Sequence, residues 1–119
     1  MPHEGKVVRN GICVETSLRA LGIYDEHPRT WPEIIATIER HGLTVKTAKY
    51  PGTLGQFTRR YHSGAWMIAT AGHAIALIDG RLTDTGRKGP KTPIQFVLSI
   101  SGVLPQKSLS QRWAEMHAV

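Results

Sequence analysis

The pattern of hydrophobic and polar positions predicts two helices near the start of the chain. In residues 14–22, Val14, Leu18 and Leu21 share one helical face, and Gly22 is a natural helix terminator. The first predicted helix therefore presents an apolar stripe to a core.

A second helix is indicated by residues 30–33, which read Thr-Trp-Pro-Glu. The threonine and the glutamate three positions later form a capping box, and proline is favoured in a first helical turn. Ile34, Ile35 and Ile38 then form an apolar stripe, and residues 41–42, His-Gly, end the helix.

After the second helix the pattern changes to the alternation and β-branched composition typical of strands. We predict strands at residues 43–48, 65–70, 73–78, 81–84 and 94–100, with a short helix at 53–61. Asp79-Gly80 is a strong hairpin signal, because glycine accepts positive φ without steric cost. Helices followed by mostly antiparallel strands favour an α+β fold over a doubly wound sheet. We expect one domain with its core in residues 10–100 and a tail at 101–119 that is either helical or loose.

Composition and length are those of one folded domain. The chain has 119 residues, of which 40% are hydrophobic and 20% are charged. No apolar run approaches the roughly 20 residues that a membrane span requires, and residues 1–6 lack the apolar stretch of a secretory signal. One cysteine cannot form an intramolecular disulfide. We therefore expect a cytoplasmic protein with a reduced thiol.

The net charge of +6 raises the question of nucleic-acid binding. The basic residues are scattered along the sequence, and their densest groups are residues 59–60 and 87–88 with Lys91. Neither a recognition motif nor zinc-ligand spacing is present. We interpret the charge mainly as solvated surface, with weak non-specific attraction to nucleic acid at most, and we expect no metal or organic cofactor.

The only cysteine, Cys13, falls in the first turn of the first predicted helix. A thiol at a helix N-terminus feels the positive end of the helix dipole, and an adjacent imidazolium would further favour the reactive thiolate. A small buried core residue is the alternative interpretation. Asn10 is the expected helix cap and, with less support, a side-chain donor to an oxyanion.

Among six histidines, His73 is the best candidate for a base, because it opens an apolar strand where an imidazole has little reason to lie unless it is paired. Asp84 is expected in the strand that returns from the hairpin turn, one diagonal step from His73, where a carboxylate can orient the ring. Asp79 is the competing carboxylate, but an aspartate in an Asp-Gly turn usually bonds to local backbone groups.

The order of Cys13, of Gly72-His73 before an apolar strand, and of Asp84-Thr85 in the next strand resembles the papain-like fold. The resemblance is closest to compact bacteriocin-processing cysteine peptidases and to small phage-encoded proteins of that shape. It covers most of residues 10–100 as a pattern of elements. It implies a papain-like α+β fold and a catalytic triad of Cys13, His73 and Asp84.

The sequence departs from that family pattern at two positions. The family has glutamine six residues before the cysteine, where this chain has Val7, and it continues Asp-Pro where this chain has Asp84-Thr85. The missing glutamine leaves the oxyanion donor unassigned.

The residues therefore predict a cysteine hydrolase that acts on an amide or isopeptide bond of a peptide or protein substrate. Two alternatives stay open: a non-catalytic papain-like interaction module, and a basic protein associated with nucleic acid. The substrate and the oligomeric state do not follow from the sequence.

Overall fold

The fold is seen in a computed structural model that describes residues 11–83 and 89–102. Within them, the helices are α1 (Gly11–Ala20), α2 (Trp31–Arg40) and α3 (Leu54–Arg60). The strands are β1 (Thr44–Ala48), β2 (Ala65–Thr70), β3 (His73–Ile78), β4 (Arg81–Thr83) and β5 (Phe96–Ser101). Most of the tail expected at 101–119 lies outside the described residues.

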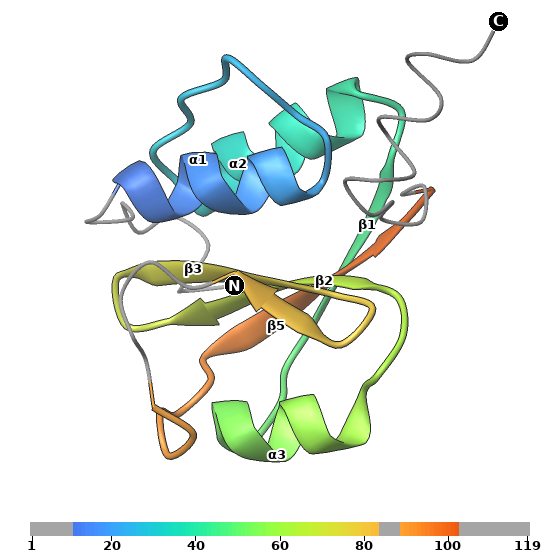
Figure 1. The fold of residues 1–119 in the computed structure, drawn as a ribbon. Helices are drawn as coiled ribbons and strands as arrows, with labels where there is room; N and C mark the ends of the chain where they lie inside the picture. Colours follow the sequence, from blue (N-terminus) through green and yellow to red (C-terminus); the bar gives the residue numbers. More distant parts are fainter. Residues whose placement is uncertain (1–10, 84–88, 103–119) are drawn as a thin grey trace, which may run out of the picture.

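The five strands form one sheet in the order β1-β5-β2-β3-β4, and every neighbouring pair is antiparallel. The last strand of the described residues, β5, is inserted between β1 and β2. Helices α1 and α2 lie on one face of the sheet, and α3 lies on the opposite face (Figure 1). The α+β class that the sequence predicts is therefore confirmed.

Each face of the sheet has its own hydrophobic cluster. Under α1 and α2 the cluster includes Leu18, Ile34, Ile38, Met67, Phe96 and Leu98. Under α3 it includes Leu54, Phe57, Ile68, Ile75, Leu77 and Val97. Consecutive residues of β2, β3 and β5 alternate between the two clusters, because successive side chains of a strand point to opposite faces. The central strands are therefore buried on both sides.

The helix boundaries follow the predicted capping signals. Helix α1 ends in a Schellman motif in which the Ile23 N–H donates to the Leu18 carbonyl at 2.9 Å and Gly22 adopts a φ of 86°. Helix α2 begins with the capping box, since the Glu33 N–H donates to the Thr30 hydroxyl at 3.3 Å and the Glu33 carboxylate accepts the Thr30 N–H at 3.2 Å. Both predictions are confirmed.

Helix α3 has a second capping box, formed by Thr53 and Gln56, that the sequence analysis did not single out. The segment after β4 also holds its N-terminus. The Leu54 N–H donates to the Thr92 carbonyl at 2.9 Å, and the Gly55 N–H donates to the Pro90 carbonyl at 2.8 Å. The first N–H groups of a helix have no acceptor within the helix, and here the segment that leads into β5 supplies carbonyl acceptors for two of them.

The hairpin between β3 and β4 has the expected register. Asp79 and Gly80 both have positive φ, 48° and 83°, as a primed two-residue turn requires. Ile78 then pairs with Arg81, and the pairing continues to Thr83. The next position, Asp84, lies outside the described residues.

The last strand begins two residues later than predicted, at Phe96. The Ile94 N–H donates to the Gly52 carbonyl at 3.0 Å instead of joining the sheet, which holds the segment against the start of α3. Of the helices in the described residues, none has the length and apolar character needed to cross a membrane.

Candidate functional site

Cys13 lies in the first turn of α1, as expected. Its residue surface is only 1% exposed, and it belongs to the cluster between α1 and the sheet together with Val14 and Leu18. Since α1 begins at Gly11, the Cys13 N–H is among the first N–H groups of the helix, which have no acceptor within the helix itself.

Two side chains of α1 bind the backbone of one residue at the start of β3. The Ala74 N–H donates to the Cys13 sulfur at 3.3 Å, and the Ser17 hydroxyl donates to the Ala74 carbonyl at 3.3 Å. Cys13 and Ser17 are four residues apart and so lie on one face of the helix. The peptide group that carries the donated hydrogen joins His73 to Ala74, so the thiol lies beside the backbone of the predicted base.

The strand register fixes the direction from which the sulfur approaches. The Asp79 N–H donates to the Gly64 carbonyl, so odd-numbered residues of β3 direct their N–H groups toward β2. The N–H of Ala74 therefore points to the other side of β3, where β4 runs. Cys13 therefore binds β3 from the α1 face of the sheet, at the edge of the strand that faces away from β2.

His73 opens β3 directly after the two-residue turn at 71–72, and it is only 4% exposed. The alternation along β3 starts its side chain on the same face as Ile75 and Leu77, opposite to the face that Ala74 presents to α1. The alternation thus directs the start of the His73 side chain away from the face on which α1 and Cys13 lie. The contact between ring and sulfur stays a prediction.

The other two predicted site residues, Asp84 and Asn10, lie outside the described residues, so their roles stay predictions. Asp79 lies in the hairpin turn, as the sequence indicates, but its carboxylate accepts the N–H of Gly64, the residue before β2, at 3.1 Å rather than a local backbone N–H. The described histidines other than His73 are exposed, in agreement with a surface role.

Sequence reasoning missed Thr70, the residue of β2 that pairs directly with His73. Thr70 is 1% exposed, and its hydroxyl is the one buried side-chain oxygen or nitrogen in the described residues that lacks a hydrogen-bond partner. A buried hydroxyl without a partner costs about 1–3 kcal/mol. Because threonine is common in strands, the sequence around Thr70 gives no signal. Only the strand register, which pairs Thr70 with His73, distinguishes it from other threonines.

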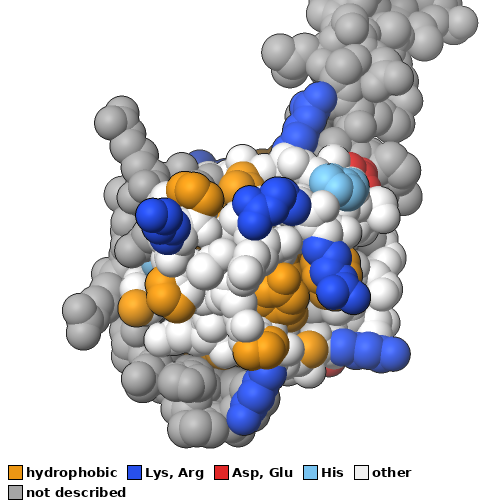
Figure 2. Space-filling model, turned by 90° about the horizontal axis from the view of Figure 1, so that it is seen from below, with side chains coloured by type: hydrophobic (Ala, Val, Ile, Leu, Met, Phe, Trp, Pro, Cys, Tyr) orange, Lys and Arg blue, Asp and Glu red, His pale blue; other side chains and the backbone are white. Residues whose placement is uncertain are grey.

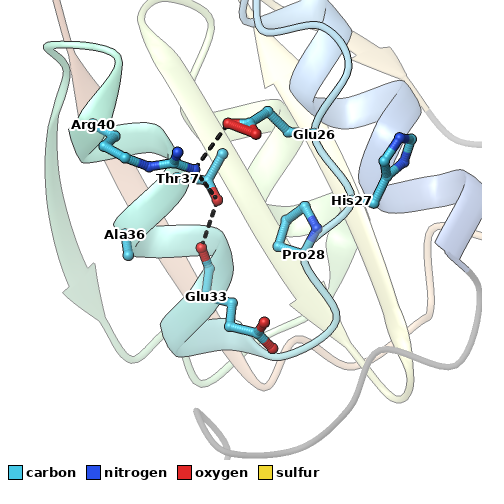
Figure 3. A pocket seen from close by; sticks show the side chains of 7 residues that line it. All are labelled: Glu26, His27, Pro28, Glu33, Ala36, Thr37 and Arg40. Carbon is cyan, nitrogen blue, oxygen red and sulfur yellow. Dashed lines mark hydrogen bonds and ion pairs between the residues drawn. The ribbon is translucent and has the colours of Figure 1, made fainter.

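A shallow cavity of about 350 Å³ lies over α2 and the segment that precedes it (Figure 3). Its polar groups already satisfy one another. Arg40 donates to the Glu26 carboxylate at 2.8 Å and to the Thr37 hydroxyl at 3.3 Å, and that hydroxyl donates to the Glu33 carbonyl at 2.8 Å. These bonds hold the segment between α1 and α2 against α2. The side chains that line the cavity are therefore engaged with one another rather than directed at a ligand.

Metal-ligating side chains are not gathered anywhere in residues 11–83 and 89–102: no group of three or more His, Cys, Asp or Glu residues there could hold an ion. Comparisons with protein-family models, curated proteins and solved structures give no match. The assignment of a function therefore depends on the geometry at Cys13 and β3.

Replacing Thr70 with valine should stabilise the protein. Valine has nearly the same shape and removes the unpartnered hydroxyl, so we expect the free energy of unfolding to rise by about 1 kcal/mol in urea denaturation. Thr70→Ser, which keeps the hydroxyl and loses the methyl group, should be less stable than the native protein. A loss of stability in Thr70→Val would show that the hydroxyl has a partner in the folded protein.

Proposed function

We propose that the chain is a papain-like cysteine hydrolase that acts on an amide or isopeptide bond of a peptide or protein substrate, with Cys13 as the nucleophile and His73 as the base. The hydrogen bond between the Cys13 sulfur and the Ala74 N–H is the observation that carries this proposal. It joins the only thiol of the chain to the peptide group of the one buried histidine among the described residues.

The reaction follows from the two side chains. His73 takes the proton of the Cys13 thiol, and the sulfur attacks the carbonyl carbon of the substrate. The imidazolium then gives its proton to the leaving nitrogen, and the carbon–nitrogen bond breaks to leave a thioester. His73 next removes a proton from water, which attacks the thioester and regenerates the thiol. The Cys13 N–H at the helix start is the described donor best suited to the oxyanion.

The magnitudes explain why the base is needed. A helix dipole stabilises an adjacent anion by about 0.3–2 kcal/mol, and the Ala74 N–H adds one hydrogen bond to sulfur. Transfer of an anion to a site as buried as that of Cys13 costs several kcal/mol. An imidazolium about 4 Å away contributes about 4 kcal/mol at an effective dielectric constant of about 20. Of these contributions, only that of a protonated His73 is large enough to offset the free-energy cost of burying the thiolate.

Asp84 completes the proposed triad as the carboxylate that orients His73, and Asn10 is a second proposed oxyanion donor. The resemblance to the papain-like fold supports both roles. The hydrogen bond from the Gly64 N–H to the Asp79 carboxylate supports Asp84 over Asp79 in the orienting role.

The burial of Cys13 favours one alternative function. A cysteine that is 1% exposed and accepts a strand N–H through its sulfur is also what a purely structural role would show. In that case the chain is a papain-like interaction module in which α1 is fixed to β3 without catalysis.

Alkylation by iodoacetamide at about pH 6 distinguishes the two functions, because an ordinary thiol is almost entirely protonated at that pH. Since the chain has one cysteine, mass spectrometry reports its modification directly. We expect Cys13 to react faster than a model thiol, and His73→Gln to slow the reaction by about 10-fold or more.

His62→Gln is the matched control, because His62 is exposed and its replacement should leave the rate unchanged. Circular dichroism checks that both variants fold. Equal rates for the native protein and folded His73→Gln would contradict the proposal, as would a thiol that reacts only after denaturation.

The two aspartates should differ in their effect on the same rate. Asp84→Asn should slow alkylation by about 10-fold, the loss that corresponds to about 1.4 kcal/mol of imidazolium stabilisation. Asp79→Asn should be almost silent, because asparagine tolerates positive φ and keeps the acceptor for the Gly64 N–H. The opposite ranking would assign the orienting role to Asp79.

A further inference from the structure

The described residues divide into two halves of opposite charge. In residues 11–42, which contain α1 and α2, the acidic side chains outnumber lysine and arginine; they are Glu15, Asp25, Glu26, Glu33 and Glu39 against Arg19, Arg29 and Arg40. The sheet and α3 instead contain Asp79 as their one described acidic residue, with Lys46, Lys49, Arg59, Arg60, Arg81 and Lys91. The net positive charge of the described chain therefore resides in the sheet and α3.

The two halves also differ in how their charges are neutralised. On the helical half, Glu26 binds Arg40 at 2.8 Å and Glu15 binds His27 at 2.9 Å. None of the six cations of the sheet and α3 forms an ion pair with a described residue. Arg60 lies against the ring of Tyr61, 5.7 Å from its centroid. These cations are therefore available to a partner.

Aromatic rings lie among these cations. Tyr50, Tyr61 and Trp66 are half-buried, and they pack with Phe57 into one cluster in which Tyr61 and Trp66 have centroids 5.0 Å apart. Seen from the α3 side, Lys and Arg side chains surround hydrophobic side chains across the face of the molecule (Figure 2).

A hollow of about 630 Å³ opens beside α3, lined by Tyr50, Pro51, Gln56, Arg59 and Arg60. It brings an aromatic ring, a side-chain amide and two guanidinium groups together at one place. The Gln56 side-chain oxygen already accepts the Thr53 N–H at 2.9 Å, which leaves its amide nitrogen as a donor.

We propose that this surface, centred on the hollow formed by Tyr50, Gln56, Arg59 and Arg60, binds single-stranded nucleic acid without regard to sequence. Unpaired cations attract the phosphates, and aromatic rings accept a stacked base, which is the combination that single-strand binding uses. An acidic protein partner would need only the positive charges for binding, and the aromatic rings would then have no role. The proposal does not depend on the thiol chemistry, which belongs to Cys13 at the other side of the sheet.

Fluorescence anisotropy with a labelled oligothymidylate of about 20 nucleotides tests the proposal. We expect binding that weakens steeply with salt, because counterion release supplies much of the affinity. Arg59→Gln/Arg60→Gln should weaken binding by about 10-fold or more at low salt and should reduce the slope of log K against log[salt] by about 1.4, or about 0.7 for each lost phosphate contact.

Arg19→Gln/Arg29→Gln is the matched control, because it removes the same charge from two exposed positions on the helical half. It should change the affinity by less than about 2-fold. Equal losses in the two double variants would overturn the proposal, since binding would then follow net charge rather than this surface.

An abasic oligonucleotide of the same length tests the rings without altering the protein. Stacking is worth about 1–3 kcal/mol per base, so the abasic strand should bind at least about 5-fold more weakly. Equal affinity for the two strands, or equal competition by polyglutamate of matched length, would overturn the assignment to nucleic acid and would indicate an acidic polypeptide as the partner.

Discussion

The attachment of α1 to β3 is the constraint on which the candidate site depends. Cys13 and Ser17 bind the N–H and the carbonyl of Ala74, on the side of β3 that faces away from β2. Side chains from a helix thus satisfy backbone groups that a neighbouring strand would otherwise bind. The same contact that fixes the helix on the sheet also sets the distance between the thiol and the backbone of His73.

The structural contact of Cys13 and its proposed role as a nucleophile make opposite demands on the thiol. A sulfur that helps to fix a helix must be enclosed, and enclosure disfavours its anion. In the proposed site, the positive charge of His73 would offset this cost, because the helix dipole is too weak to do so alone. Thr70, which pairs with His73 and has an unpartnered hydroxyl, adds a second departure from an ordinary core at the same end of β3.

Much of the local structure could be predicted because short-range signals determine it. The capping box at Thr30, the terminator Gly22 and the Asp79-Gly80 turn each act over a few residues, and all three are found. The position of β5 between β1 and β2 could not be predicted, since strand order depends on pairing between segments distant in sequence. The same limitation hid the hollow that Tyr50, Arg59 and Arg60 line beside α3.

For the candidate site, the sequence identified Cys13 and His73 from their context, and the structure brings the thiol to the peptide group after His73. The contribution of Ser17 was missed, because a serine within a helix carries no signal until its partner strand is known. Thr70 was missed for a similar reason, since only the β2–β3 register pairs it with His73.

The most direct measurement of the central claim is the ultraviolet absorbance of the thiolate at about pH 6, which does not require a reagent to reach the buried sulfur. The difference spectrum between the native protein and Cys13→Ser isolates the only thiol of the chain. The account predicts a thiolate band that disappears in His73→Gln and persists in His62→Gln. A native protein without the band, or a band that survives in folded His73→Gln, would contradict the pairing of Cys13 with His73.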